Sequence, residues 1–152
     1  MLSSIFITQT VNAVCEALES AGIDSGAITV LEQPRIGRAL ASRGHQVVQV
    51  ADKARSLRRI LGDRMCSEPD VLPLADNRID AVVAPGVGQR DDWNKLLSEW
   101  SRVVREGGVI VMVDRAQPTE LTRRALCSGL AEIGQRQVGR TIVTSGLVKK
   151  IV

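Results

Sequence analysis

The sequence is poor in aromatic residues and has a single histidine. Phe6, Trp93 and Trp100 are its three aromatic side chains, and tyrosine is absent. Protein modules that stack nucleobases need several aromatic side chains, so the composition argues against this form of nucleic-acid recognition. The one histidine, His45, is far from every cysteine in the sequence. This scarcity of ligands predicts that the protein holds no metal.

Cysteine is also rare, and its spacing bears on location. Cys15, Cys66 and Cys127 are odd in number, far apart and form no C-x-x-C pair. This pattern favours reduced thiols and a cytoplasmic protein. Residues 1–10 carry no positively charged region, and polar residues interrupt their apolar stretch. We therefore expect neither a signal peptide nor a membrane span.

Positive charge is in slight excess and is scattered along the chain. Lysine and arginine number 20 against 17 acidic residues, and a formal charge of +3 is too small for a nucleic-acid footprint. The densest cluster is Arg55, Arg58 and Arg59, whose spacing places them on one face of a helix. A solvated helix face is the interpretation we favour, and an anion or partner contact is the alternative.

What the chain does contain is an alternation of apolar runs and helical patterns. Its 152 residues, 44% hydrophobic and 24% charged, predict one globular domain spanning residues 1–152. Helical spacing predicts helices over residues 9–21, 35–43, 52–61, 91–105 and 119–133. Short apolar or β-branched runs predict strands over residues 28–31, 46–50, 64–68, 79–84, 109–113, 137–144 and 147–152.

The order of these elements predicts the architecture. Strands that alternate with helices form a doubly wound, mostly parallel α/β sheet. The two last strands, joined at Ser145 and Gly146, predict an antiparallel hairpin at one edge. Two further glycines, Gly107 and Gly108, are expected to end the helix before the fifth strand.

Three segments carry a resemblance to a known family. Residues 72–83 (LPLADNRIDAVV), 103–114 (VVREGGVIVMVD) and 42–48 (SRGHQVV) are similar to segments of the class I S-adenosylmethionine-dependent methyltransferases, of the type 11-like group. They match the approach to that family's fourth strand, its Gly-Gly turn with the fifth strand, and its approach to the second strand. The resemblance implies a seven-stranded Rossmann-like methyltransferase fold.

The resemblance places the cofactor loop directly after the first predicted strand. Glu32 matches the family's acidic position, and Gly37 matches the last glycine of the loop. Between them, residues 33–35 (Gln-Pro-Arg) replace glycines, and the loop is shorter than in the family. Pro34 has no amide hydrogen and a fixed φ, and it restricts the residue before it. The sequence therefore predicts a degenerate cofactor-binding motif.

Other cofactor positions follow the later strands. The family ends its second strand with an acidic residue that binds ribose, but Ala51 holds that position and Asp52 comes one residue later. Asp52 is therefore a candidate to bind the ribose of the cofactor, although we favour a role as a helix cap. Glu68 matches the residue that meets the adenine amine, with a solvated loop carboxylate as the alternative. Ala84 and Gly86 match positions near the methionine part of the cofactor.

No catalytic residue is predicted. Gln89 and Arg90, after the fourth strand, are poor proton acceptors near neutral pH, and Asp91 or Asp92 is expected to cap a helix. His45 precedes the second strand, on the side away from the strand ends where α/β sheets bind ligands, so we expect it to be structural. The chain also lacks an insertion that would form a lid over the site.

These observations leave three functions open. We favour a pseudo-methyltransferase, a non-catalytic binding or assembly module that needs no cofactor and acts through a protein partner or self-association. The surface that binds the partner would be a strand edge or an apolar patch, and the candidates are residues 137–152 and the helix around Trp93. The alternative is an active S-adenosylmethionine-dependent methyltransferase of unidentified substrate, completed by a partner. A third function is binding of another nucleotide or anion through Arg35, Arg38 or the Arg55 cluster.

Overall fold

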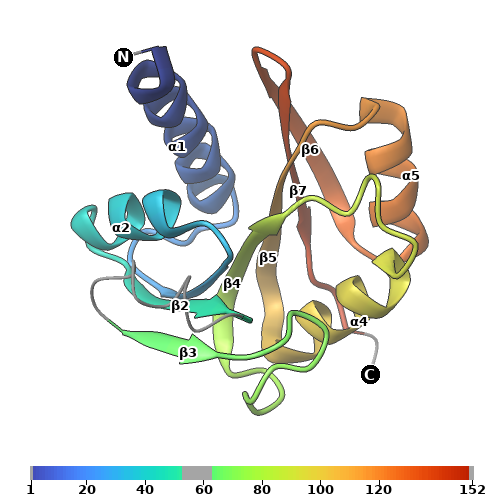
Figure 1. Cartoon of the computed structure of the whole chain (residues 1–152). Helices are drawn as coiled ribbons and strands as arrows, with labels where there is room; N and C mark the ends of the chain where they lie inside the picture. Colours follow the sequence, from blue (N-terminus) through green and yellow to red (C-terminus); the bar gives the residue numbers. More distant parts are fainter. Residues whose placement is uncertain (1, 53–62, 151–152) are drawn as a thin grey trace.

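Seven strands form one mixed sheet in the order β3-β2-β1-β4-β5-β7-β6 (Figure 1). The computed structural model describes residues 2–52 and 63–150. Pairing is parallel from β3 through to β5, whereas β7 is antiparallel to both β5 and β6. The strands are β1 (Ala27–Leu31), β2 (Gln46–Ala51), β3 (Arg64–Cys66), β4 (Ile79–Pro85), β5 (Val104–Asp114), β6 (Ala131–Val138) and β7 (Thr141–Leu147). The expected α/β architecture is confirmed.

Helices cover both faces of the sheet. The described helices are α1 (Leu2–Ser20), α2 (Pro34–Ser42), α4 (Trp93–Val103) and α5 (Pro118–Cys127). Two apolar clusters fill the interior: α1 and α2 contribute to one, and α4 and α5 to the other. Strand β4 shows how the sheet separates them, because Ala81 and Val83 belong to the first cluster while Val82 and Ala84 belong to the second. Such two-sided burial explains the uninterrupted apolar runs of the central strands.

The predicted start of the first helix and the predicted end of the helix before β5 are wrong. Helix α1 begins at Leu2 rather than at residue 9, because the polar Thr8 and Gln9 lie on its exposed side and do not interrupt it. Helix α4 ends at Val103, and Gly107 and Gly108 lie inside β5 rather than at a helix terminus. Sequence periodicity could not place this boundary, since residues 103 and 104 are both apolar and both fully buried.

The C-terminal hairpin is confirmed, but its position differs from the prediction. Helix α5 ends at Cys127, and the residues that were expected to continue it to position 133 begin β6. The turn is formed by Gly139 and Arg140, with φ of +60° at Gly139. Ser145 and Gly146, the predicted turn, lie within β7, where a Cβ on Gly146 would be 2.8 Å from Leu130.

Several expectations concern residues beyond this description. The helix predicted over residues 52–61 lies largely outside the described residues, and with it the arginine cluster at Arg55.

Among the helices of the described residues, none is long and apolar enough to cross a membrane. In the same part of the chain, no three cysteine, histidine or acidic side chains group as metal ligands.

Candidate cofactor site

The turn after β1 is unusually tight. Only Glu32 and Gln33 separate the end of β1 from Pro34, the first residue of α2. Glu32 has a φ of +54°, a left-handed conformation that is uncommon for a residue with a side chain. Its amide donates to the Val50 carbonyl at 2.9 Å, which ties the turn to β2. Gln33 holds the N-cap position without a side-chain capping bond, so the helix starts on proline geometry alone.

The carboxylate of Glu32 bonds across the strand ends. Its Oε1 accepts a hydrogen bond of 2.7 Å from the backbone amide of Asp52. The structure therefore brings together two of the residues that the sequence assigned to the cofactor. Both are exposed at the carboxyl ends of β1 and β2. The Glu32 carboxylate already has a main-chain donor, which a ribose or an amine would have to displace.

Gly37, in the first turns of α2, faces a side chain of β2. A Cβ at Gly37 would lie 2.5 Å from Cδ of Gln49, so only a glycine lets α2 approach β2 this closely. Gln49 is 4% exposed, and its Oε1 has no hydrogen-bond partner among the described residues. Sequence reasoning found Gly37 and missed Gln49. The available signal was a glutamine inside the apolar run QVVQV.

Glu68 lies on the same side of the sheet as the other two acids. The amide of Ser67 donates to the Ala51 carbonyl at 3.0 Å, so the chain leaves β3 beside the end of β2. Glu68 follows in an exposed loop, and its carbonyl accepts from Val71 at 3.3 Å. Glu32, Asp52 and Glu68 thus follow the carboxyl ends of three neighbouring strands, as the family resemblance implied.

The loop after β4 is held by Asp114, which sequence reasoning missed. Asp114 ends β5, and its Oδ2 accepts from the Gly88 amide at 2.6 Å while its Oδ1 accepts from the Arg115 amide at 2.7 Å. A Cβ at Gly86 would lie 1.9 Å from the Asp114 carboxyl carbon. Gly86 is therefore required by a protein contact, and Ala84 before it is fully buried inside β4.

Open cavities border this loop. One of about 390 Å³ is lined by Gly86, Arg90, Arg115 and other residues, and a second of about 520 Å³ lies between Arg115 and Arg140. A smaller, mostly apolar cavity of about 250 Å³ separates Phe6 of α1 from the start of α2. The two larger cavities present guanidinium groups and amides, which bind and orient anions but do not accept protons.

The acidic groups at these cavities are already bonded: Asp114 lines the smaller of the two and accepts from the Gly88 and Arg115 amides, and the acidic groups named next are in ion pairs. Asp92, rather than Asp91, holds the N-cap position of α4, but its side chain makes no capping bond. It accepts a hydrogen bond from Arg90 instead, and this bond lowers the pKa of Asp92. Hydrogen bonds from Arg123 and then Arg124 lower the pKa of Glu120 to about 2. Both carboxylates are ionised and paired near neutral pH, so they are poor general bases.

Three other residues singled out in the sequence lie outside this region. His45 is at the start of β2, where its Nδ1 accepts from the Gly26 amide at 3.3 Å, as expected for a structural histidine. The Trp100 indole donates to the Pro69 carbonyl at 2.9 Å. Trp93 is half-buried beneath the guanidinium of Arg124, 5.4 Å from the ring centroid.

Comparison with known proteins identifies the family. The sequence model of the methyltransferase domain family matches residues 35–112. This segment spans half of the chain, from the start of α2 to near the end of β5. The chain therefore belongs to the methyltransferase domain family, and its strand order is that of the class I S-adenosylmethionine-dependent fold. Comparison with curated protein sequences returns no match.

Solved structures of similar fold are distant in sequence. A chain from the Haloferax volcanii complex of a methyltransferase with the Trm112 methyltransferase activator has 13% identity and a TM-score of 0.76, with 91% of this chain and 89% of that one covered. The Burkholderia thailandensis 1,6-didemethyltoxoflavin-N1-methyltransferase, solved with S-adenosylhomocysteine, has 12% identity and a TM-score of 0.77, with 95% and 79% covered. A Thermotoga maritima S-adenosylmethionine-dependent methyltransferase has 15% identity and a TM-score of 0.70, with 90% and 89% covered. At these identities the likeness concerns the fold.

Proposed function

We propose that this chain is a pseudo-methyltransferase, a non-catalytic member of the family that serves as a binding or assembly module. The observation that carries the proposal is the contact between Gly37 and Gln49. The family resemblance places a nucleoside against bare main chain after β1, but that turn contains no glycine here, and Gly37, the first glycine after it, lies in α2 and is packed against Gln49 of β2. We infer from these features that the residues present are a poor fit for S-adenosylmethionine, because the turn has only two residues and no glycine, and a proline without an N–H group follows it.

The neighbouring residues support the same proposal. Pro34 offers no N–H group where a cofactor would need one, and the Glu32 carboxylate is bonded to the Asp52 amide. A ligand that used the Glu32 carboxylate would have to break that bond before making its own contact. Each displaced hydrogen bond costs about 0.5–1.5 kcal/mol, so the affinity would fall by roughly two- to tenfold for each one.

The proposed role is that of a protein that works through a protein partner or through a second copy of itself. The fold supports this, because a chain of the same architecture comes from a complex with a methyltransferase activator. Three free cysteines, two of them exposed, support a cytoplasmic location. Small scattered charge and few aromatic residues speak against a nucleic-acid partner.

Isothermal titration with S-adenosylmethionine and with S-adenosylhomocysteine tests the proposal. We expect no binding heat up to about millimolar ligand. The Burkholderia enzyme named above, which was solved with S-adenosylhomocysteine, is the positive control. Gln49→Ala empties the space beside Gly37, and weak binding by this variant alone would assign the loss to Gln49. Micromolar binding by the unmodified chain would contradict the proposal.

One observation favours an alternative, an active methyltransferase. Glu32, Asp52 and Glu68 still follow the ends of three adjacent strands, in the order that the family uses for the cofactor. If a partner chain rearranged the turn after β1, these acids could hold S-adenosylmethionine, which supplies an electrophilic methyl group. Incubation of the protein with labelled S-adenosylmethionine in cell lysate tests this alternative. Label transfer that disappears with Glu32→Ala would support it.

A further inference from the structure

The two edges of the sheet differ in length and exposure. Strand β3 forms one edge with three residues, whereas β6 forms the other with eight. Within the described residues β6 pairs only with β7, so its outer side has no partner strand there. Glu132, Gly134, Gln135, Arg136 and Gln137 are all exposed along it. A long open edge is a template for pairing with another chain.

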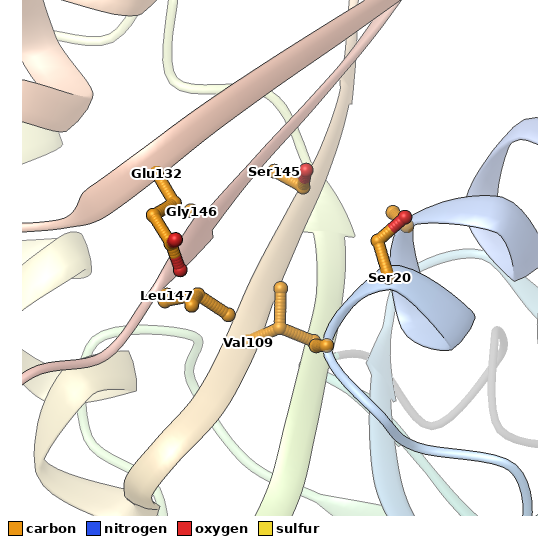
Figure 2. Close-up of a pocket in the computed structure, with 8 residues that line it drawn as sticks. Ser20, Val109, Glu132, Ser145, Gly146 and Leu147 are labelled. Atoms are coloured by element: carbon orange, nitrogen blue, oxygen red, sulfur yellow. The ribbon is translucent and has the colours of Figure 1, made fainter.

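The side chains of β6 sort by face. Glu132 lines a cavity of about 230 Å³ with Ser20 of α1 and Ser145 of β7 (Figure 2). Arg136 lies on the same face, where it forms an ion pair with Glu16 of α1. The Arg136 side chain remains 53% exposed in that pair, and a guanidinium has five N–H donors, so it can bind a second carboxylate.

Main-chain geometry restricts how a second strand can pair with β6. The two-residue turn joins Val138 and Thr141 as a hydrogen-bonded pair. Hydrogen-bonded and non-bonded pairs alternate along an antiparallel ladder, so Gln135 and Gln137 direct their N–H and C=O groups away from β7. A partner strand must therefore match its own outward-facing residues to these positions. This rule excludes half of all registers.

We propose that two copies of this chain pair antiparallel along β6, with Gly134 of each copy opposite Gly134 of the other. In this register Gln135 of each copy faces Ile133 of the other, so the new ladder crosses the bulge at Glu132, whose φ of +49° must become extended on pairing. The register also places Glu132 of each copy opposite Arg136 of the other on one face, which forms two symmetric ion pairs. A register shifted by two residues would set Arg136 against Gly134 and leave Glu132 unmatched.

The pairing is short, and the dimer is correspondingly weak. A bulge between Ala131 and Gly134 interrupts the ladder with β7, and bulges increase the local twist of an edge strand. Interfaces of this limited size belong to transient complexes. We therefore expect a dimer that dissociates at micromolar concentrations. The inference rests on the proposed assembly role, but it does not depend on whether S-adenosylmethionine binds.

Sedimentation velocity on the full chain, from about 10 to about 500 µM, tests the pairing. The unmodified chain should dimerise, and Glu132→Arg or Arg136→Glu should each weaken the dimer at least tenfold by placing like charges opposite one another. An equimolar mixture of the two variants should recover dimers, because Glu132→Arg in one chain then faces Arg136→Glu in the other. Asp63→Arg, the same charge change near the opposite edge, is the matched control.

Several outcomes would overturn the proposal. A monomer throughout the range, a dimer insensitive to both variants, or a mixture that stays monomeric would each do so, as would binding of an unrelated protein strand by a monomeric chain. Titration with S-adenosylhomocysteine is independent of these results, so a failure of the proposed function and a failure of the dimer are distinguishable. Circular dichroism of each variant checks that it is folded.

Disulfide formation tests the register separately. In a Cys66→Ser, Cys127→Ser background, Gly134→Cys should cross-link two copies, since opposite residues of a non-hydrogen-bonded pair have Cα atoms about 4.5 Å apart. The new Cβ meets the Ser145 hydroxyl at 3.2 Å, which a small rotation relieves. Gln135→Cys, opposite Ile133 of the other copy, should not cross-link. The reverse result would overturn the stated register.

Discussion

The segments that follow β1 and β4 both contain a glycine in close contact with a polar side chain: Gly37 lies in α2, just after the turn that follows β1, and Gly86 lies in the loop after β4. In each, a glycine without a side chain lets a polar side chain from a neighbouring strand pack on it: Gln49 on Gly37, and Asp114 on Gly86. Both oxygens of Asp114 accept main-chain hydrogen bonds. The Oε1 of Gln49 has no partner among the described residues. The second segment is therefore stabilised by its polar group, whereas the first carries an uncompensated one.

The largest effect should come from Gly86→Ala. The new Cβ would lie within 2.0 Å of Asp114 atoms, so the carboxylate must leave and two amides lose their acceptor. We expect a loss of about 2–4 kcal/mol in the free energy of unfolding, measured by urea denaturation followed by circular dichroism. Asp114→Ala alone should cost about 1–3 kcal/mol. The double variant should cost less than the sum, and strict additivity would contradict this coupling.

A smaller effect is expected for Gly37→Ala, and its sign should depend on whether Gln49 is present. Gly37→Ala should destabilise the protein by about 1–2 kcal/mol, since Gln49 has to move. A Gln49→Ala background removes the three atoms nearest to the new Cβ, and alanine gains about 0.5–1 kcal/mol over glycine in a helix. Gly37→Ala should then stabilise. Chemical denaturation of the four proteins gives the cycle, and an unchanged sign would show that the contact does not restrict position 37.

The fold was largely predictable from the local sequence pattern. The errors in the predicted helix and strand bounds arose where the pattern does not mark a boundary. Alternating and continuous apolar runs located β1, β2, β4 and the apolar part of β5. Periodicity failed where α4 passes directly into β5 through the apolar Val103 and Val104, and again after Cys127, where Ser128 and the left-handed Gly129 end α5 before β6 begins. Those boundaries depend on pairing, as when Val104 pairs with Ile79, and a single sequence does not display pairing.

The site was predictable in its positions and not in its contacts. Family resemblance located Glu32 and Gly37, and the structure places them at the end of β1 and at the start of α2. The partners Gln49 and Asp114 come from strands distant in sequence, 12 and 28 positions away from Gly37 and Gly86. Their side chains were hidden inside strand patterns, because an apolar run with one polar residue does not reveal what that residue touches.

The smallest effect is expected at Glu32, whose side chain makes a stabilising hydrogen bond and whose backbone has an unfavourable left-handed conformation. Left-handed φ costs roughly 1–2 kcal/mol for a residue with a Cβ, while the exposed bond to the Asp52 amide returns about 0.5–1.5 kcal/mol. Glu32→Ala loses the bond and keeps the strain, so it should destabilise by about 1 kcal/mol. Glu32→Gly loses the bond and the strain together, so it should be close to neutral. Equal unfolding free energies for the two variants would mean that the left-handed conformation of Glu32 carries no backbone penalty in this turn.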